Sequence, residues 1–299
     1  MKYYAGIDIG GGSIKGSLIS EDGKLFSEYT APTNKFWNNQ EFIEATAAVI
    51  KKLSSAYHLD AIGIGSPGPL DLDKGQVIHS TNLPNLSNAN IVSSIAKIFP
   101  VPVFLNNDAN CAALGEYFFG SYQKEHSLVV LTLGTGLGGG WVNKGALFNG
   151  YNGNAMEAGH VTIVKDGAKC GCGKNGCAES YFSATGLINR FSEVSNKTVA
   201  NVSEIFSLAM SGDKIAQNTI FFGVEILAEL VKSIIHLINP DRVVFVGGLT
   251  KSWDFYSPEL IKKVREIVFP VFSDYVKIEK GSGVAGSYGA AALCFRGMK

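Results

Sequence analysis

Three of the five cysteines in this chain lie close together, at positions 170, 172 and 177, in a C-x-C-x4-C spacing interrupted by glycines. Glycine relaxes the backbone, so three sulfur atoms at this spacing can turn toward one point. His160 lies ten residues before the first of them. Since tetrahedral zinc takes four sulfur or nitrogen ligands, Cys170, Cys172, Cys177 and His160 form a candidate Cys3His site. A closed site of this kind holds a loop in place and leaves no open position for catalysis.

Two alternatives to a metal site stay open for these cysteines. They could be unpaired thiols in a glycine-rich surface loop, although this spacing in a cysteine-poor chain favours a metal. A disulfide would leave one thiol over, and nothing else in the sequence indicates an oxidising compartment. We therefore predict a structural Zn2+ ion that closes the loop 157–179.

Two carboxylates flank this loop, Glu157 at its start and Glu179 at its end. A metal that closes the loop brings them together, and carboxylates on a rigid loop are suited to accept hydrogen bonds from sugar hydroxyls. His160 can bind the metal through one ring nitrogen while the other faces a substrate. The loop therefore predicts a sugar contact made by Glu157, His160 and Glu179.

Two glycine clusters follow apolar stretches that have the pattern of strands. Residues 3–9 lead into Gly10-Gly11-Gly12, and residues 127–133 lead into Gly134-Thr-Gly-Leu-Gly-Gly-Gly140. A second strand and a turn follow each cluster, so each is predicted to form the tip of a hairpin. Because the features recur in the same order, we expect two copies of one domain plan.

Backbone N–H groups at two such tips would bind a polyphosphate chain, as in ATP, from both sides. Asp8, at the end of the first strand, can reach Mg2+ directly or through its waters. The candidate nucleotide contacts here are Asp8, Gly10, Gly11, Gly12, Ser13, Lys15, Thr135, Gly136 and Gly138. Tight turns alone would explain one glycine cluster, but they explain the repeated pair poorly.

The second cluster also matches the G-x-G-x-x-G spacing of a dinucleotide-binding fingerprint, at Gly134, Gly136 and Gly139. That fingerprint requires a helix after the glycines. The residues that follow, Trp141-Val-Asn-Lys-Gly145, are typical of a strand and a turn. The hairpin interpretation is therefore favoured.

A further acidic residue, Asp108, lies where a predicted strand gives way to a helix. The strand 101–106 ends at Asn107-Asp108, and residues 109–119 have the pattern of a helix. A carboxylate at this point lies at the ligand-binding edge of an α/β sheet, where it can act as a general base. The alternative is that Asp108 only caps the helix, as aspartate often does.

The last third of the chain is predicted to be mostly helical. One long helix should run from Asp213 to Asn239-Pro240, and Ser257-Pro258-Glu259 predicts the start of another, with proline at its first position. Between them, the buried strand 241–246 ends in Gly247 and Gly248, where an adenine or ribose can approach the backbone. These two glycines are further candidate nucleotide contacts.

Composition excludes some partners. Acidic and basic residues balance at 26 each, which gives no electrostatic case for binding nucleic acid or an anionic membrane. The chain opens into a strand pattern, not a signal peptide, and charged residues interrupt its most apolar segment, 220–238. We expect a soluble, cytoplasmic protein.

The motifs together resemble one family. Glu157-x-Gly-His160 followed by C-x-C-G-x2-G-C-x-E is similar to the signature of the ROK family, which contains bacterial sugar kinases and sugar-responsive repressors. The segments Pro67-Gly-Pro69, Asn82-Leu-Pro84 and Leu105-Asn-Asn-Asp-Ala-Asn110 resemble further family segments. The chain departs from the family pattern at Met156, where glycine is common, and in the absence of a tryptophan after Pro84.

The resemblance implies an α/β fold of the actin-like, ribonuclease-H-like type, with two domains and a cleft between them. We expect an N-terminal domain 1–119, against which the last helix, about 285–299, packs, and a C-terminal domain 120–299. The resemblance adds Gly65, Asn82 and Asn107 to the sugar contacts and makes Asp108 the catalytic base. The implied activity is phosphorylation by ATP, with Mg2+, of the primary (6-) hydroxyl of a hexose or N-acetylhexosamine, in a homodimer.

Two alternatives to this function stay open. A sugar-responsive repressor would need a helix-turn-helix module, for which the sequence before the first strand leaves no room. A non-catalytic sugar sensor on the same fold is disfavoured by Asp8, Asp108 and both glycine-rich tips. The identity of the sugar among glucose, mannose, fructose, N-acetylglucosamine, N-acetylmannosamine and a β-glucoside stays open.

Overall fold

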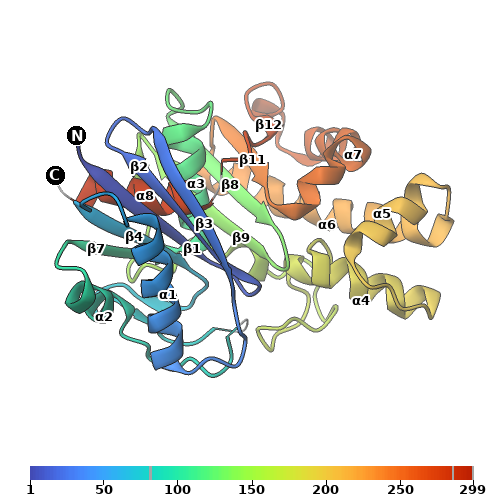
Figure 1. Ribbon diagram of the computed structural model, residues 1–299. Helices are drawn as coiled ribbons and strands as arrows, with labels where there is room; N and C mark the ends of the chain where they lie inside the picture. Colours follow the sequence, from blue (N-terminus) through green and yellow to red (C-terminus); the bar gives the residue numbers. More distant parts are fainter. Residues whose placement is uncertain (81–82, 285, 298–299) are drawn as a thin grey trace. The chain divides into compact units, whose positions relative to one another are not determined.

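Two sheets with the same strand order organise the fold, as seen in a computed structural model that describes residues 1–80, 83–284 and 286–297 (Figure 1). In the described residues, the first five-stranded sheet has the order β3-β2-β1-β4-β7 and the second has the order β10-β9-β8-β11-β12. The first contains β1 (Tyr3–Ile9), β2 (Ser13–Ser20), β3 (Leu25–Pro32), β4 (Ala61–Ser66) and β7 (Val103–Asn107). The second contains β8 (Ser127–Leu133), β9 (Leu137–Asn143), β10 (Ala146–Leu147), β11 (Arg242–Val246) and β12 (Lys277–Lys280). β5 (Leu70–Asp71) and β6 (Gln76–Val77) pair separately.

The repeat predicted from the glycine clusters is confirmed in this strand order. β1 is the central strand of the first sheet, with its hairpin partner β2 on one side and the parallel strand β4 on the other. β8 is central in the second sheet, between β9 and the parallel strand β11. The α/β class predicted from the sequence is likewise confirmed by these sheets and the helices that flank them.

Helices cover both faces of the first sheet. Ala5, Ile7 and Ile9 share one buried cluster with α1 (Asn39–Leu53) and α2 (Ile91–Ile98). On the other face, Tyr4 packs with residues of α8 (Gly286–Gly297), which also contacts α3 (Asp108–Phe119). Because successive side chains of a strand point to opposite faces, β1 is buried on both sides. Segments from the two ends of the chain therefore lie side by side in one core (Figure 1).

The chain divides into two compact units. Unit 1 comprises residues 1–124, 140–156 and 282–299, and unit 2 comprises residues 125–139 and 157–281. The helices of unit 2 are α4 (Ala184–Ser195), α5 (Val202–Met210), α6 (Lys214–Ile238) and α7 (Trp253–Ile267). The domain boundary that we placed after residue 119 stays a prediction.

The long helix α6 agrees with its sequence prediction. Asp213 caps its start by accepting the N–H of Ala216 at 2.9 Å, and Asn239 ends it in a left-handed conformation. The prediction for α7 is wrong, because this helix begins at Trp253 and contains Pro258 in its interior. The preceding 3-10 helix, Gly248–Ser252, runs directly into it. None of the helices in the described ranges has the length and apolarity that a bilayer crossing requires.

Candidate functional site

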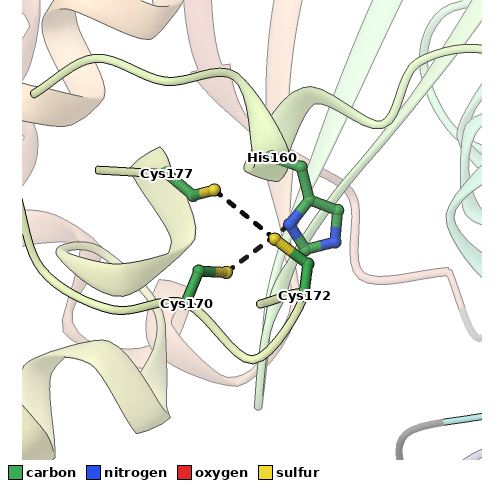
Figure 2. Close-up of side chains that lie close together, drawn as sticks. All are labelled: His160, Cys170, Cys172 and Cys177. Carbon is green, nitrogen blue, oxygen red and sulfur yellow. Dashed lines mark hydrogen bonds between the residues drawn. The ribbon is translucent and has the colours of Figure 1, made fainter. Parts of the chain in front are cut away.

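The four predicted metal ligands converge. The Sγ atoms of Cys170, Cys172 and Cys177 and a ring nitrogen of His160 all lie within 4.8 Å of one another. Figure 2 shows the four side chains turned toward a common point. Cys170 and Cys177 are buried, whereas Cys172 and His160 are exposed, so the cluster lies at the surface of unit 2.

The distances within the cluster match a tetrahedral metal. Ligands about 2.3 Å (sulfur) and about 2.0 Å (nitrogen) from a tetrahedral centre lie about 3.8 Å apart for two sulfurs and about 3.6 Å apart for sulfur and nitrogen. The Sγ atoms of Cys172 and Cys177 are 3.7 Å apart, and Sγ of Cys170 is 3.6 Å from Nδ1 of His160. A disulfide needs a separation of about 2.0 Å, so the disulfide alternative does not fit. The donor set fits a structural zinc ion.

The local backbone gives the cluster its shape. Isolated bridges join Thr162 to Cys177 and Lys169 to Asn175. The turn between the cysteines contains Gly173 at a φ of 85° and Gly176 at a φ of 78°, a region that favours glycine. A Cβ atom at Gly176 would lie 1.7 Å from the carbonyl oxygen of Val164, so the turn cannot close around a larger residue. These constraints explain why glycines occupy positions 173 and 176 between Cys172 and Cys177.

The three thiols can all be ionised at the same time only if a cation lies beside them. Burial raises the pKa of the Cys177 thiol to about 12, and it also raises the pKa of Cys170. Backbone hydrogen bonding near Lys174 lowers the pKa of the exposed Cys172. Since metals bind the thiolate form, a bound ion has to displace the proton of Cys177 at neutral pH.

Glu157 and Glu179 lie at the two ends of the metal loop, as predicted. Desolvation raises the pKa of Glu157, His160 opposes this shift, and the charge of Glu179 adds to it. The Glu179 carboxylate accepts the N–H of Leu137 at 2.8 Å through Oε2, and its Oε1 lies 3.7 Å from Sγ of Cys170. Glu179 is therefore in contact with a predicted metal ligand and with the second glycine-rich hairpin.

In unit 1, three parallel strands bring the other predicted residues to one edge. Asp8 of β1 is paired in register with Gly65 of β4, and Gly65 is paired with Asn106 of β7. Ser66 lies beside Asn107, which precedes Asp108. A Cβ atom at Gly65 would lie 3.7 Å from Cα of Asp108 and only 3.0 Å from Sγ of Cys111, which makes glycine the best fit. Asp8, Gly65, Asn107 and Asp108 thus gather where parallel strands end, the usual ligand-binding edge.

Asn107 caps the helix α3, not Asp108. Its Oδ1 accepts the N–H of Ala109 at 2.8 Å and that of Asn110 at 3.4 Å. Asp108 is the first residue of the helix, an acidic residue in its first turn. Asp108 is not the N-cap residue, but its Oδ1 also accepts the N–H of Ala109 at 2.8 Å, so a structural role at the helix start stays open beside the catalytic one.

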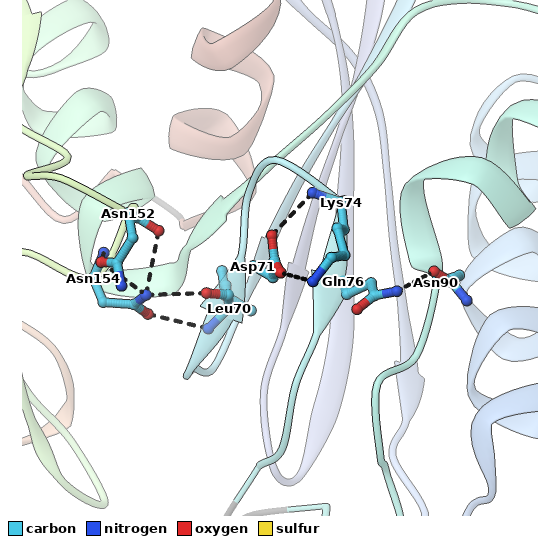
Figure 3. Close-up of polar contacts among 7 residues, drawn as sticks. All are labelled: Leu70, Asp71, Lys74, Gln76, Asn90, Asn152 and Asn154. Atoms are coloured by element: carbon cyan, nitrogen blue, oxygen red, sulfur yellow. Dashed lines mark hydrogen bonds and ion pairs between the residues drawn. The ribbon is translucent and has the colours of Figure 1, made fainter.

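The Pro67-Gly-Pro69 loop is fixed by a side chain from a distant segment. Asn154 accepts the N–H of Leu70 at 3.1 Å and donates to its carbonyl oxygen at 3.0 Å (Figure 3). A Cβ atom at Gly68 would lie 3.6 Å from Nδ2 of Asn107, which places the loop beside the residue that precedes Asp108. Asn82, predicted as a sugar contact, lies outside the described residues.

Asn106, Asn110 and Asn149 form an asparagine cluster at the same edge of the sheet, which was not predicted from the sequence. Asn106 donates to Asn149 at 3.0 Å and accepts from the side chain of the fully buried Asn110 at 2.9 Å. Asn106 also accepts the N–H of Asn107 at 2.8 Å. Only the run of amides in Leu105-Asn-Asn-Asp-Ala-Asn110 hinted at this cluster. Its role is to fix the backbone on either side of Asp108.

The first glycine cluster forms the tip of a hairpin, as predicted. Gly11 and Gly12 are exposed, and Gly10 donates its N–H to the carbonyl oxygen of Ser13 at 2.9 Å. Asp8 and Lys15 are cross-strand partners in this hairpin. Desolvation raises the pKa of Asp8, and the charge of Lys15 partly offsets the shift. A cation bound beside Asp8 would favour the ionised carboxylate and so lower its pKa again.

The second tip has internal partners for several amides. Gly138, a predicted phosphate contact, donates its N–H to Oγ1 of Thr132 at 3.1 Å, and Gly134 donates to the carbonyl oxygen of Gly136 at 3.0 Å. Thr135 is exposed at the tip. Gly247 has a φ of 101°, and its Cβ atom would lie 2.5 Å from the carbonyl oxygen of Leu133. Gly247 and Gly248 therefore lie at the same strand edge as the tip.

The profile of the ROK family matches residues 4–296 of this chain. The chain belongs to the ROK family. This result confirms the resemblance carried by the motifs, and it covers both units.

Individual ROK proteins are similar over nearly the whole chain. The glucokinase of Thermotoga maritima is 34% identical over 304 residues, covering 96% of each chain. A ROK hexokinase from Thermus thermophilus superposes with a TM-score of 0.87 at 29% identity, covering 97% of each chain. A ROK family glucokinase from Streptomyces griseus, solved in complex with glucose and AMPPNP, superposes with a TM-score of 0.84 at 26% identity, covering 98% of each chain.

Proposed function

We propose that this ROK protein is an ATP-dependent sugar kinase that phosphorylates the primary (6-) hydroxyl of a hexose or N-acetylhexosamine. The observation that carries the proposal is the alignment, within unit 1, of Asp8, Gly65 and Asn107-Asp108 at the ends of three neighbouring strands. The T. maritima glucokinase and the S. griseus glucokinase complex support a hexose acceptor and an adenine nucleotide donor.

Asp108 is the general base in this proposal. It accepts the proton of the sugar hydroxyl as the hydroxyl oxygen attacks the terminal phosphorus of ATP, and ADP leaves. Asn107 and the asparagine cluster hold the backbone on both sides of Asp108, so its carboxylate position is well defined. Positioning of this kind supplies much of the rate enhancement in phosphoryl transfer.

The sugar is held by Glu157, His160 and Glu179 from the metal loop and by Gly65, Asn82 and Asn107. Nucleotide contacts come from the first tip, with Ser13 and Lys15, and from Thr135, Gly136, Gly247 and Gly248. Mg2+ near Asp8 neutralises charge on the phosphate oxygens when it is bound. Zn2+ at His160, Cys170, Cys172 and Cys177 shapes the loop and has no chemical step of its own. A homodimer is expected from the family resemblance.

The test is release of ADP from MgATP across a panel of hexoses and N-acetylhexosamines, for the wild type and Asp108→Asn. Asn has nearly the same shape as Asp but cannot accept the proton, so kcat should fall by about 10²–10⁴-fold while calorimetric sugar affinity is retained. Asp254→Asn, an exposed change on α7, serves as the matched control and should keep full activity.

Two results would count against the proposal. If a sugar binds but no sugar releases ADP, a non-catalytic sugar sensor becomes the better description. If Asp108→Asn keeps wild-type kcat, the kinase assignment survives but Asp108 is not its base.

A further inference from the structure

Glu179 joins two parts of unit 2 that the proposed function treats separately. Its carboxylate accepts the N–H of Leu137, at the end of the second hairpin tip, and lies 3.7 Å from Sγ of Cys170 in the metal cluster. Leu137 and Cys170 are both buried and Glu179 is half-buried, so the connection is partly shielded from solvent. When a metal is bound, Cys170 is a thiolate and donates no proton, so the link from the metal to Glu179 runs through the chain from Cys177, two residues before Glu179.

The backbone after Glu179 makes further bonds to the same tip. Ala184 donates its N–H to the carbonyl oxygen of Gly134 at 2.9 Å, and Thr185 donates to that of Thr135 at 3.3 Å. Ser183 holds this turn by donating to the carbonyl oxygen of Glu179 at 2.8 Å. Residues 179–185 therefore contact the tip at both ends.

The same contact gives a reason for a glycine in the tip. A Cβ atom at Gly136 would lie 2.3 Å from Oε2 of Glu179. Any larger residue would push the carboxylate away from the N–H of Leu137. Gly136 was predicted from the sequence to bind phosphate, and in the structure the space that a side chain at this position would take is filled by this carboxylate.

We propose that Glu179 is a positioning residue that holds the hairpin tip 134–137 on the metal loop, so that the bound metal sets the affinity for the triphosphate of the nucleotide. The inference rests on the proposed function, since it takes this tip as a phosphate-binding element. It differs from a purely sugar-binding role of Glu179, because that role predicts no effect on nucleotide.

The experiment measures AMPPNP binding in the presence of Mg2+ and absence of sugar, by calorimetry on the metal-loaded protein. Glu179→Ala should weaken AMPPNP binding by about tenfold or more, because the N–H of Leu137 loses a charged acceptor. Glu179→Gln keeps an acceptor oxygen and should stay within about threefold of the wild type. Asp166→Asn, an exposed change within the metal loop, is the control and should leave AMPPNP binding unchanged.

A second readout uses no nucleotide at all. Hydrogen exchange of the amides 134–138 should become faster in Glu179→Ala and in wild type after chelation of the metal. Because both changes break one connection, chelation of Glu179→Ala should add little at these amides. Unchanged exchange elsewhere in 125–281, together with a cooperative thermal transition, shows that the variant is folded.

The possible results separate the two proposals. If Glu179→Ala weakens sugar binding but leaves AMPPNP affinity and exchange of 134–138 at wild-type values, the positioning role is wrong and the kinase proposal stands. If the wild type binds no AMPPNP, the kinase proposal and the link to nucleotide affinity fail together, whatever the variants do.

Discussion

Met156 has a left-handed backbone conformation, with a φ of 64°, directly before Glu157 of the metal loop. This conformation costs a residue with a Cβ atom roughly 1 kcal/mol or more, whereas glycine adopts it freely. The family pattern commonly has glycine here, and the structure gives the physical reason. This chain keeps a strained, partly buried methionine beside a predicted sugar ligand. Strain at such a position is a reason to look for a function.

We predict that Met156→Gly raises the free energy of unfolding by about 0.5 kcal/mol, because relief of strain exceeds the added flexibility of the unfolded chain. The same change should alter the ranking of sugars by kcat/KM, since it removes a side chain next to Glu157. Urea denaturation and steady-state kinetics across the sugar panel measure the two effects.

Lys144→Gly is the matched control for strain. Lys144 also has a positive φ, 49°, but lies exposed in the turn between β9 and β10. It should give a similar gain in stability with no change in sugar ranking. A loss of stability in Met156→Gly would mean that packing of the methionine outweighs its strain.

Among the elements, α8 depends on glycines at its contacts. A Cβ atom at Gly6 of β1 would lie 1.9 Å from the carbonyl oxygen of Ser287, and one at Gly63 of β4 would lie 1.8 Å from that of Ala290. On its other side, a Cβ atom at Gly289 would lie 1.6 Å from the carbonyl oxygen of Cys111 in α3. The helix is therefore packed backbone to backbone between the sheet and α3, the helix that begins with Asp108.

Gly6→Ala should lower the free energy of unfolding by about 1–3 kcal/mol or more, because the clash is with backbone, which cannot rotate away. Gly12→Ala is the matched change, since a Cβ atom there meets nothing within 4 Å. Its effect on stability should stay within about 0.5 kcal/mol. Denaturant unfolding of both variants tests the prediction, and equal stabilities would show that α8 can shift to make room.

The helix ends also show when a sequence predicts a boundary. The ends of α6 were predicted because Asp213 and Asn239-Pro240 are strong local signals at a start and a stop. The start of α7 was not predicted, because the 3-10 helix Gly248–Ser252 continues directly into it and Pro258 lies inside the helix. Trp253, its first residue, is buried and packs on Phe245, with ring centroids 5.3 Å apart. Tertiary packing of this kind can override a local signal for a helix boundary.

The residues of the candidate site likewise fall into those that the sequence could predict and those that it could not. Residues at strand ends, such as Asp8 and Asp108, could be predicted because strand order brings them to one edge. The metal ligands could be predicted because their spacing is itself the signal. The hydrogen bonds that Asn149 and Asn154 make could not be predicted, because their partners lie 43 and 84 residues away in the sequence. Pairings at that separation depend on the whole fold and leave no local pattern.

At the scale of the whole molecule, the chain passes between its two compact units after residues 124, 139, 156 and 281. Candidate sugar and nucleotide residues occur in both units, Asn107 and Ser13 in unit 1 and Glu157 and Thr135 in unit 2. Each unit therefore contains candidate contacts for both ligands, and a ligand that binds only the native chain stabilises it against unfolding.

We therefore predict that the sugar and AMPPNP together raise the midpoint of thermal unfolding by more than either ligand alone, because each adds its own binding free energy to the native state. Asp108→Asn should show the same increase, because it removes the base and keeps the binding contacts. AMPPNP alone should give a smaller change, since the sugar contacts of the metal loop are then missing. If calorimetry shows both ligands bound while the midpoint stays unchanged, binding is not confined to the native chain, and the candidate contacts in the two units are not the ones that hold the ligands.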